Sequence, residues 1–276
     1  MHSHQTSQFL TPTPQNPLLQ NPVVQMALHI LTQLQPRLTQ PYIDPGDWNK
    51  FRITCGQLDV SWKSEKGGAF LQLITPEKMQ QIASQYEFDQ LRELRPDPSY
   101  PFNNSDVVAT HLCHHFRCIY QDEYLICRSK WENRLPDDWE ADKLRYFSPG
   151  EEFWQVKYVL SVRDGHLPHM GGVLLEVGQL KENTLLFSEV WSILMLTLLR
   201  YHTSGNEKIQ VVPVTLVTIS GTTFRIVQGF VDSKAGRVRI HKSGIMQVGP
   251  DKKTVKERMM LMVRWMLAEP VWPSKQ

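Results

Sequence analysis

The sequence contains little cysteine and no long apolar run. Its four cysteines, at positions 55, 113, 118 and 127, lack the spacing of a disulfide framework. No stretch approaches the roughly 20 consecutive apolar residues that cross a bilayer. The N-terminus lacks a basic segment followed by an apolar one, which argues against a secretory signal. We therefore expect reduced thiols, an intracellular location in the cytoplasm or nucleus, and no membrane association.

Several widespread catalytic motifs are missing as well. The sequence has no Gly-x-Ser-x-Gly, no Gly-x-Gly-x-x-Gly and no P-loop. These absences argue against a serine hydrolase of that type, a dinucleotide-dependent enzyme and a nucleoside triphosphatase. No internal repeat is visible. With 276 residues, of which 41% are hydrophobic, the chain can bury one sizeable core or form one domain with a smaller lobe.

Charge is distributed unevenly, although the formal net charge is only +2. Residues 41–180 carry a net charge of −6 and residues 181–276 a net charge of +7. A basic end on a nearly neutral protein is suited to phosphate or to an acidic partner. The candidate nucleic-acid-binding residues are Arg225, Arg237, Arg239 and Lys242. The alternative is an ordinary solvated face.

Composition and periodicity divide the chain into four regions. They are a disordered tail (1–25), an N-terminal α+β region (26–150), an α/β core (151–270) and a short tail (271–276). In the N-terminal region we predict an antiparallel hairpin of 51–62 with 69–74 and a surface loop at 131–149. Helices are predicted at 24–38, 75–86, 87–94 and from about 104 onward.

The helix that begins near residue 104 carries closely spaced histidines. His111 and His115 are four residues apart, as are His114 and Cys118. Imidazole and thiolate pairs on one helix face can bind zinc, but no second ligand pair follows at a suitable spacing. Ordinary core or partly exposed histidines are therefore the preferred interpretation.

The core region alternates strands and helices in a regular order. Strands are predicted at 153–162, 172–177, 210–220 and 222–231, with an edge strand at 237–240 and a long apolar helix at 185–201. An amphipathic helix at 252–267 is rich in methionine, which fills irregular gaps in a core or forms a face for a protein partner. The fold class is therefore α/β, with a mixed central β-sheet of about five strands flanked by helices.

One acidic residue stands inside an apolar strand. Glu176 follows Val173-Leu174-Leu175 and precedes Val177. Burying a carboxylate costs free energy unless a partner compensates its charge. Glu176 is therefore either a functional residue or the partner of a base, for which Lys157 and Arg200 are the candidates.

The order of these elements, with Asp164 before the second strand and Leu175-Glu176-Val177-Gly178 at its end, resembles the PD-(D/E)XK nuclease-like superfamily, particularly its fungal versions. The resemblance covers roughly residues 153–240. It implies a restriction-endonuclease-like core in which an acidic residue on one strand faces a Glu-x-Lys on the next. The implied metal ligands are Asp164 and Glu176, which would hold Mg²⁺, and the implied catalytic residues are Asp164, Glu176 and Lys181.

The chain departs from the superfamily pattern at two positions. Gly178 stands where the motif has lysine, and Lys181 reaches the site only if a bulge or strand end redirects it, because alternate residues of a strand face opposite sides. Asp164 lies in the turn before the strand, about 13 Å along the strand from Glu176 if residues 165–171 form the turn. One Mg²⁺ could not then bind both carboxylates directly.

Two functions remain open from the sequence. The first is a nuclease-like protein, catalytically intact or degenerate, that acts on or binds nucleic acid with Mg²⁺ as cofactor if it is catalytic. The second is a non-catalytic module on the same fold that binds a protein partner through its C-terminal basic and methionine-rich region.

Overall fold

The computed structural model describes residues 17–85, 101–116, 119–120, 123–134, 144–148, 151–164, 166–204 and 209–272. The predicted helix at 87–94, the first part of the N-terminal tail and the last four residues lie outside these ranges. The fold class is confirmed at the level of an α/β protein with a large mixed central sheet flanked by helices. Among the described residues, no helix is long and apolar enough to cross a membrane.

A nine-stranded mixed sheet forms the centre of the molecule. Its main path runs β2-β14-β13-β12-β10-β9-β7, while β15 pairs with β13 and β8 pairs with β9. The strands are β2 (Ile53–Gln57), β7 (Trp131–Arg134), β8 (Arg145–Ser148), β9 (Glu151–Val162), β10 (Met170–Glu176), β12 (Val214–Ser220), β13 (Thr223–Asp232), β14 (Arg237–Lys242) and β15 (Met246–Gln247). The β10–β12 and β14–β2 pairs are parallel, and the other pairs are antiparallel.

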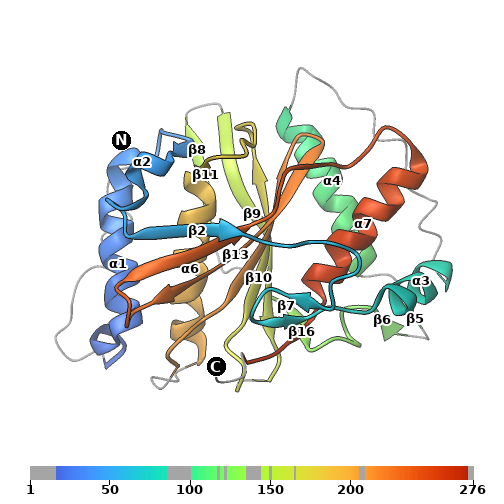
Figure 1. The fold of residues 1–276 in the computed structure, drawn as a ribbon, viewed down its shortest axis with the longest axis horizontal. Coiled ribbons are helices and arrows are strands. Elements are labelled where there is room, and N and C mark those ends of the chain that lie inside the picture. The colour runs from blue at the N-terminus through green and yellow to red at the C-terminus, as the bar shows by residue number, and fades with distance from the viewer. Residues whose placement is uncertain are drawn as a thin grey trace.

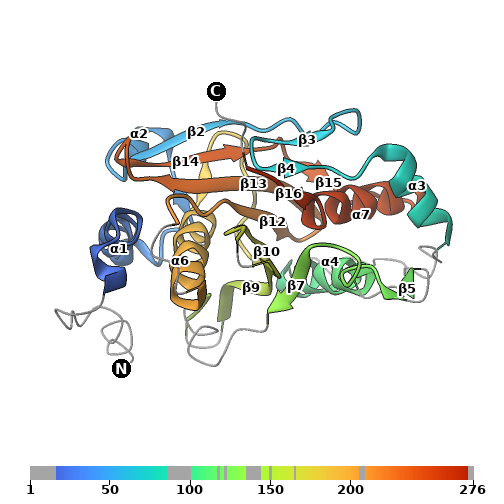
Figure 2. The same ribbon diagram turned by 90° about the horizontal axis from the view of Figure 1, so that it is seen from below.

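Helices cover both faces of this sheet (Figures 1 and 2). On one face lie α1 (Pro22–Leu34) and α6 (Phe187–Ser204), and on the other lie α4 (Pro101–Phe116) and α7 (Lys252–Met266). The remaining helical segments are η2 (Pro17–Gln20), η3 (Gln35–Arg37), α2 (Pro45–Trp48) and α3 (Pro76–Gln85). The small strands outside the main sheet are β1 (Tyr42–Ile43), β3 (Lys66–Gly67), β4 (Leu71–Gln72), β5 (Ile119–Tyr120), β6 (Glu123–Tyr124), β11 (Leu185–Leu186) and β16 (Glu269–Pro270).

The helix α6 carries the chain from β10 to the parallel strand β12, as the sequence predicts. It is apolar nearly all round because it packs between the sheet and α1, so that Val190, Ile193, Leu194 and Leu196 are all fully buried. This crossover places the first turn of α6 beside the end of β10. The end of β10 is where Glu176 lies.

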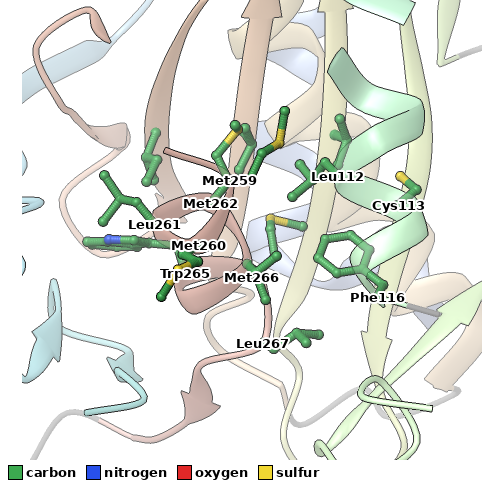
Figure 3. Packing of buried hydrophobic residues seen from close by; sticks show 14 of the residues in the cluster. Leu112, Cys113, Phe116, Met259, Met260, Leu261, Met262, Trp265, Met266 and Leu267 are labelled. Atoms are coloured by element: carbon green, nitrogen blue, oxygen red, sulfur yellow. The ribbon is translucent and has the colours of Figure 1, made fainter. Parts of the chain in front are cut away.

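The methionine-rich helix α7 belongs to the core. Met259, Met262 and Met266 are at most 2% exposed, and Figure 3 shows them in one cluster with Leu112 and Phe116 of α4. The hypothesis that the methionines form a face for a protein partner is therefore wrong for this side of α7. The sequence alternative of core packing is confirmed, and it agrees with the ability of methionine to fill irregular gaps.

Several predicted boundaries need correction. The strand β2 does not form a hairpin with residues 69–74 but joins the central sheet in parallel with β14, which is therefore an inner strand. The expected loop at 131–149 contains β7 and β8, both paired with β9. The N-terminal region thus supplies three strands of the central sheet. The tail expected to end at residue 25 includes the start of α1.

The N-terminus of α1 is capped by Asn21, which permits a prediction. The Asn21 side-chain oxygen accepts hydrogen bonds from the backbone N–H groups of Val23 (2.9 Å) and Val24 (3.4 Å). We expect Asn21→Ala to lower the free energy of unfolding by about 1 kcal/mol, because two donors of the first turn lose their acceptor. Urea denaturation should detect the change, and Asn21→Asp should retain most of the stability. Equal losses in both variants would contradict a capping role.

Candidate functional site

Glu176 is the last residue of β10 and is buried. Its side chain is 3% exposed and lies on the sheet face that packs against α6, the face that Leu174 also occupies. The helix turn that meets it contributes Ser188, whose Oγ donates to Glu176 Oε2 at 2.5 Å. The backbone N–H of Gly178 donates to the other carboxyl oxygen, Oε1, at 2.9 Å. The side chain therefore serves as an internal acceptor that joins β10 to α6.

Burial raises the pKa of Glu176 to about 7. Desolvation is the main cause, and the charge of Glu189 adds to it, while the hydrogen bonds from Ser188 and Gly178 oppose it. Neither base proposed from the sequence compensates the charge. Lys157 forms an ion pair with Asp106 at 2.7 Å, and Arg200 donates to the carbonyl of Leu167. The predicted salt bridge to Glu176 is therefore wrong, and two neutral donors take its place.

Pro41 and Tyr42, at the start of β1, lie close to the segment that follows β10. The backbone N–H of Phe187 donates to the carbonyl of Pro41, and the Tyr42 hydroxyl donates to the carbonyl of Gln179, both at 2.9 Å. Burial and the charge of Glu176 both raise the pKa of Tyr42. A Cβ atom at Gly178 would lie 3.3 Å from Glu176 Oε1 and 3.5 Å from Pro41 Cβ. The space into which the motif lysine would extend is therefore bounded by the carboxylate and by Pro41.

Lys181, the candidate replacement for that lysine, is directed elsewhere. Its side chain is exposed, and Nζ lies over the Tyr42 ring, 3.8 Å from the ring centroid. Its carbonyl accepts a hydrogen bond from Arg225. The described contacts of Lys181 thus hold it on the outer side of Tyr42 and do not join its ammonium to Glu176.

Asp164 lies at the opposite end of β10 from Glu176. Its carboxylate accepts from the backbone N–H of His166 at 2.9 Å, which is the contact of a turn residue. Glu176 is the last of the seven residues of β10, and this turn lies before the first. A strand of that length spans about 20 Å. The proposal that Asp164 and Glu176 share one Mg²⁺ is therefore wrong, and the separation exceeds the one expected from the sequence.

The first residues of the neighbouring strand β9, and not its last, lie beside Glu176. The pairing register places Trp154 opposite Glu176, and β9 begins with the acidic residues Glu151 and Glu152. An acidic partner on the adjacent strand would have to come from this end. The turn predicted between the two strands implies this antiparallel pairing, and the structure adds its register.

The described residues do not fit the Mg²⁺ site that the resemblance implies. No group of three or more His, Cys, Asp or Glu side chains in the described part of the chain is arranged to hold a metal ion. The histidines of α4 form no such group with other described residues, and Cys118 lies outside the described ranges. Burial lowers the pKa of His115 to about 4. Mg²⁺ prefers several charged or carbonyl oxygens and water in octahedral geometry. Glu176 instead has both oxygens engaged by protein donors.

Two of the four candidate phosphate-binding residues are internal. Arg225 is fully buried and forms a two-contact ion pair with Glu189, with Nε–Oε1 at 2.7 Å and Nη2–Oε2 at 2.5 Å. The backbone N–H of Leu186 also donates to Glu189. Lys242 is 6% exposed, and its ammonium donates to the carbonyl of Glu182. Neither side chain is available to phosphate on the surface, which corrects the expectation for both.

Arg237 and Arg239 do reach the surface. Along β14, exposed and buried positions alternate, so these two residues and His241 share the exposed face while Lys242 faces the core. Arg239 Nε donates to Asp232 at 2.8 Å, and Arg237 Nε donates to the carbonyl of Ala235. Sequence reasoning missed His241, although the alternation of β14 would have placed it beside the two arginines.

The geometry thus contains a buried acidic residue at the strand end where the resemblance expects a metal ligand, and a separate exposed basic face on β14. Comparisons with protein-family models, with curated proteins and with solved structures find no match to this chain.

Proposed function

We propose that this chain is a nuclease-like domain that binds nucleic acid and does not cleave it. The order of elements supports the proposal, because β9, β10 with Glu176, α6, β12 and β13 follow each other as the resemblance to the PD-(D/E)XK superfamily requires. Glu176 also lies at the end of the strand before the crossover helix, the place where the resemblance puts the metal-binding glutamate.

The engagement of Glu176 is the observation that carries the non-catalytic part of the proposal. A carboxylate that binds Mg²⁺ must be ionised and must present an oxygen to the ion. Glu176 is 3% exposed, has a pKa raised to about 7 and accepts hydrogen bonds on both oxygens. Pro41 and Tyr42 bound the same region. Glu176 thus occupies the position at which the resemblance expects a metal ligand, but its side chain stabilises the contact between β10 and α6.

The exposed face of β14 supports the binding part. Arg237 and Arg239 present two guanidinium groups on neighbouring positions of one strand face, and guanidinium groups bind phosphate through two parallel hydrogen bonds. The side-chain hydrogen bond described for each arginine runs through Nε, so the terminal nitrogens are the groups offered to a ligand. The alternative function is binding of a protein partner. The methionine residues of α7 cannot form the surface for such a partner, because they are buried.

A cleavage and binding assay tests this proposal. We expect no cut of plasmid or single-stranded DNA and RNA over a titration of Mg²⁺, and binding whose affinity falls as salt rises. The double variant Arg237→Gln/Arg239→Gln should weaken binding several-fold and make the salt dependence shallower, because up to two phosphate contacts are lost. Fluorescence anisotropy of labelled oligonucleotides at several salt concentrations measures both quantities.

The matched control removes two exposed cations elsewhere. Lys252→Gln/Lys253→Gln changes the net charge equally but lies at the start of α7. This control should bind nearly as the unmodified protein does. Metal-dependent cleavage that Glu176→Gln abolishes would contradict the non-catalytic part of the proposal. Absence of any nucleic-acid binding would contradict the binding part and favour the protein-interaction module.

A further inference from the structure

A pocket opens on the sheet face opposite to Glu176. Its volume is about 470 Å³, which lies in the usual range for small-molecule sites. Its lining includes Lys66, Phe70, Gln228, Phe230, Arg239 and His241. Residues 224 and 226 of β13 belong to the cluster on the α7 side of the sheet, whereas Glu176 lies on the α6 side. Residues 228 and 230 point to the same side as 224 and 226, because alternate residues of a strand share a face.

Two cross-strand pairs form one wall of the pocket. Phe230 of β13 lies opposite Arg239 of β14, and Gln228 lies opposite His241. The exposed arginine of the basic face thus also lines the pocket. The pocket is consequently continuous with the surface proposed above to contact phosphate.

The segment from Leu58 to Phe70 forms the other wall. Phe70 meets Phe230 edge to face, with ring centroids 5.1 Å apart, and Phe230 is only half-buried. The buried amide of Gln228 donates to the carbonyl of Gly67 at 3.2 Å and so joins the two walls. Gly68 has φ +65°, and a Cβ atom there would lie 2.3 Å from Gln228 Oε1. This glycine permits the close approach of the segment to the sheet.

The polar lining groups suit both parts of a nucleotide. Lys66 and Arg239 supply positive charge, of which Asp59 in the pocket and Asp232 beside Arg239 offset a part. Burial, together with the charge of Arg239, lowers the pKa of His241. Its imidazole is therefore neutral at neutral pH and can donate to and accept from the edge of a base. Aromatic rings offer bases a stacking surface without regard to sequence.

We propose that this pocket receives one nucleotide, its base stacked on Phe230 and its phosphate near Lys66 and Arg239. The inference rests on the proposed function, which it narrows to single-stranded nucleic acid, because a base within a duplex cannot enter a pocket without leaving its stack. A free nucleotide offers the same chemistry as a nucleotide within a strand. The two sources are separated by the experiment.

The experiment measures affinity for three probes. These are adenosine 5′-monophosphate, a short labelled single-stranded oligonucleotide and a duplex of the same sequence. We expect the single strand to bind more tightly than the duplex. Phe230→Ala should weaken binding of the single strand about tenfold or more, and Lys66→Gln should weaken it several-fold. Thermal unfolding of each variant verifies that it is folded.

Two matched controls accompany these variants. Tyr124→Ala removes a 52% exposed aromatic side chain outside the pocket, and Lys63→Gln removes an exposed cation outside its lining. Both should change affinity less than twofold. Equal effects of Phe230→Ala and Tyr124→Ala, or a duplex bound as tightly as the single strand, would overturn this inference.

The outcomes also separate this inference from the proposed function. If the protein binds nucleic acid in a salt-dependent manner and Phe230→Ala leaves the affinity unchanged, the proposed function stands. The inference that the pocket receives a nucleotide is then refuted. A second outcome is that the protein binds adenosine 5′-monophosphate but neither oligonucleotide, and that Phe230→Ala abolishes this binding. The pocket would then be a nucleotide site, and the proposed function would be refuted. Absence of binding to all three probes refutes both.

Discussion

Arg225→Met is expected to lower the free energy of unfolding by about 3–5 kcal/mol, because it leaves the carboxylate of Glu189 buried without its cation. Both side chains of this ion pair are 0% exposed, and Arg225 also donates to the carbonyls of Lys181 and Thr184. The substitution therefore removes four described hydrogen bonds from the interior. Urea denaturation measured at neutral pH gives the change directly.

Two comparisons identify the cause of that loss. Arg225→Met/Glu189→Gln should recover part of the stability, because the buried charge is gone while a side-chain oxygen remains for the N–H of Leu186. Arg239→Met removes an arginine from the solvent-exposed pair with Asp232 and should cost less than about 1 kcal/mol. A loss of similar size in Arg225→Met and Arg239→Met would contradict the structural role of Arg225.

Glu176→Gln is expected to stabilise the protein at neutral and alkaline pH. The pKa of Glu176 is about 7 in the folded protein against 4.5 for the unperturbed group, a difference worth about 3 kcal/mol. Below pH 4.5 the group is protonated in both states and the two proteins differ little. As the pH rises toward 7, the unfolded state releases the proton and the folded state retains it, so the unmodified protein loses stability. Above pH 7 the difference reaches its full value.

Stability measured against pH checks this prediction. The amide of glutamine reproduces both contacts, since its oxygen accepts from Gly178 and its nitrogen donates to Ser188 Oγ. The difference between variant and unmodified protein should therefore grow from near zero at acidic pH to about 3 kcal/mol at pH 8. Glu257→Gln, an exposed position on α7, should follow the unmodified protein throughout. Destabilisation by Glu176→Gln at pH 8 would show that the charged carboxylate is needed for folding.

The sequence predicts the centre of the sheet because each element there carries a local signal. The helix α6 is apolar nearly all round, and β12 is a continuous apolar and β-branched run, as expected of a strand covered on both faces. The outer strands lack such signals. Trp131-Glu132-Asn133-Arg134 forms β7 although only its first residue is buried, and β2 finds its partner β14 some 185 positions later in the chain. Only tertiary pairing identifies these strands.

The sequence predicts only part of the candidate site, for a similar reason. The continuous apolar run around Glu176 predicts that this acidic residue is buried, and a buried carboxylate requires a compensating partner. Its partners are the hydroxyl of Ser188 and the backbone N–H of Gly178, which cannot be predicted from the pattern of charged residues. Glu189 in the apolar helix α6 and Arg225 in the apolar strand β13 carried a comparable signal, and two opposite charges in buried elements could have been matched.

An NMR titration of the Glu176 side-chain carboxyl carbon, with and without Mg²⁺, tests most directly whether this residue is a buried structural acceptor. The variant Glu176→Gln assigns the signal. We expect a midpoint near 7 that Mg²⁺ leaves unchanged, because the carboxyl group is buried and accepts hydrogen bonds from Ser188 and Gly178. A midpoint at or below 4.5 would contradict the burial of this carboxyl group, and a midpoint that falls when Mg²⁺ is added would restore Glu176 as a metal ligand.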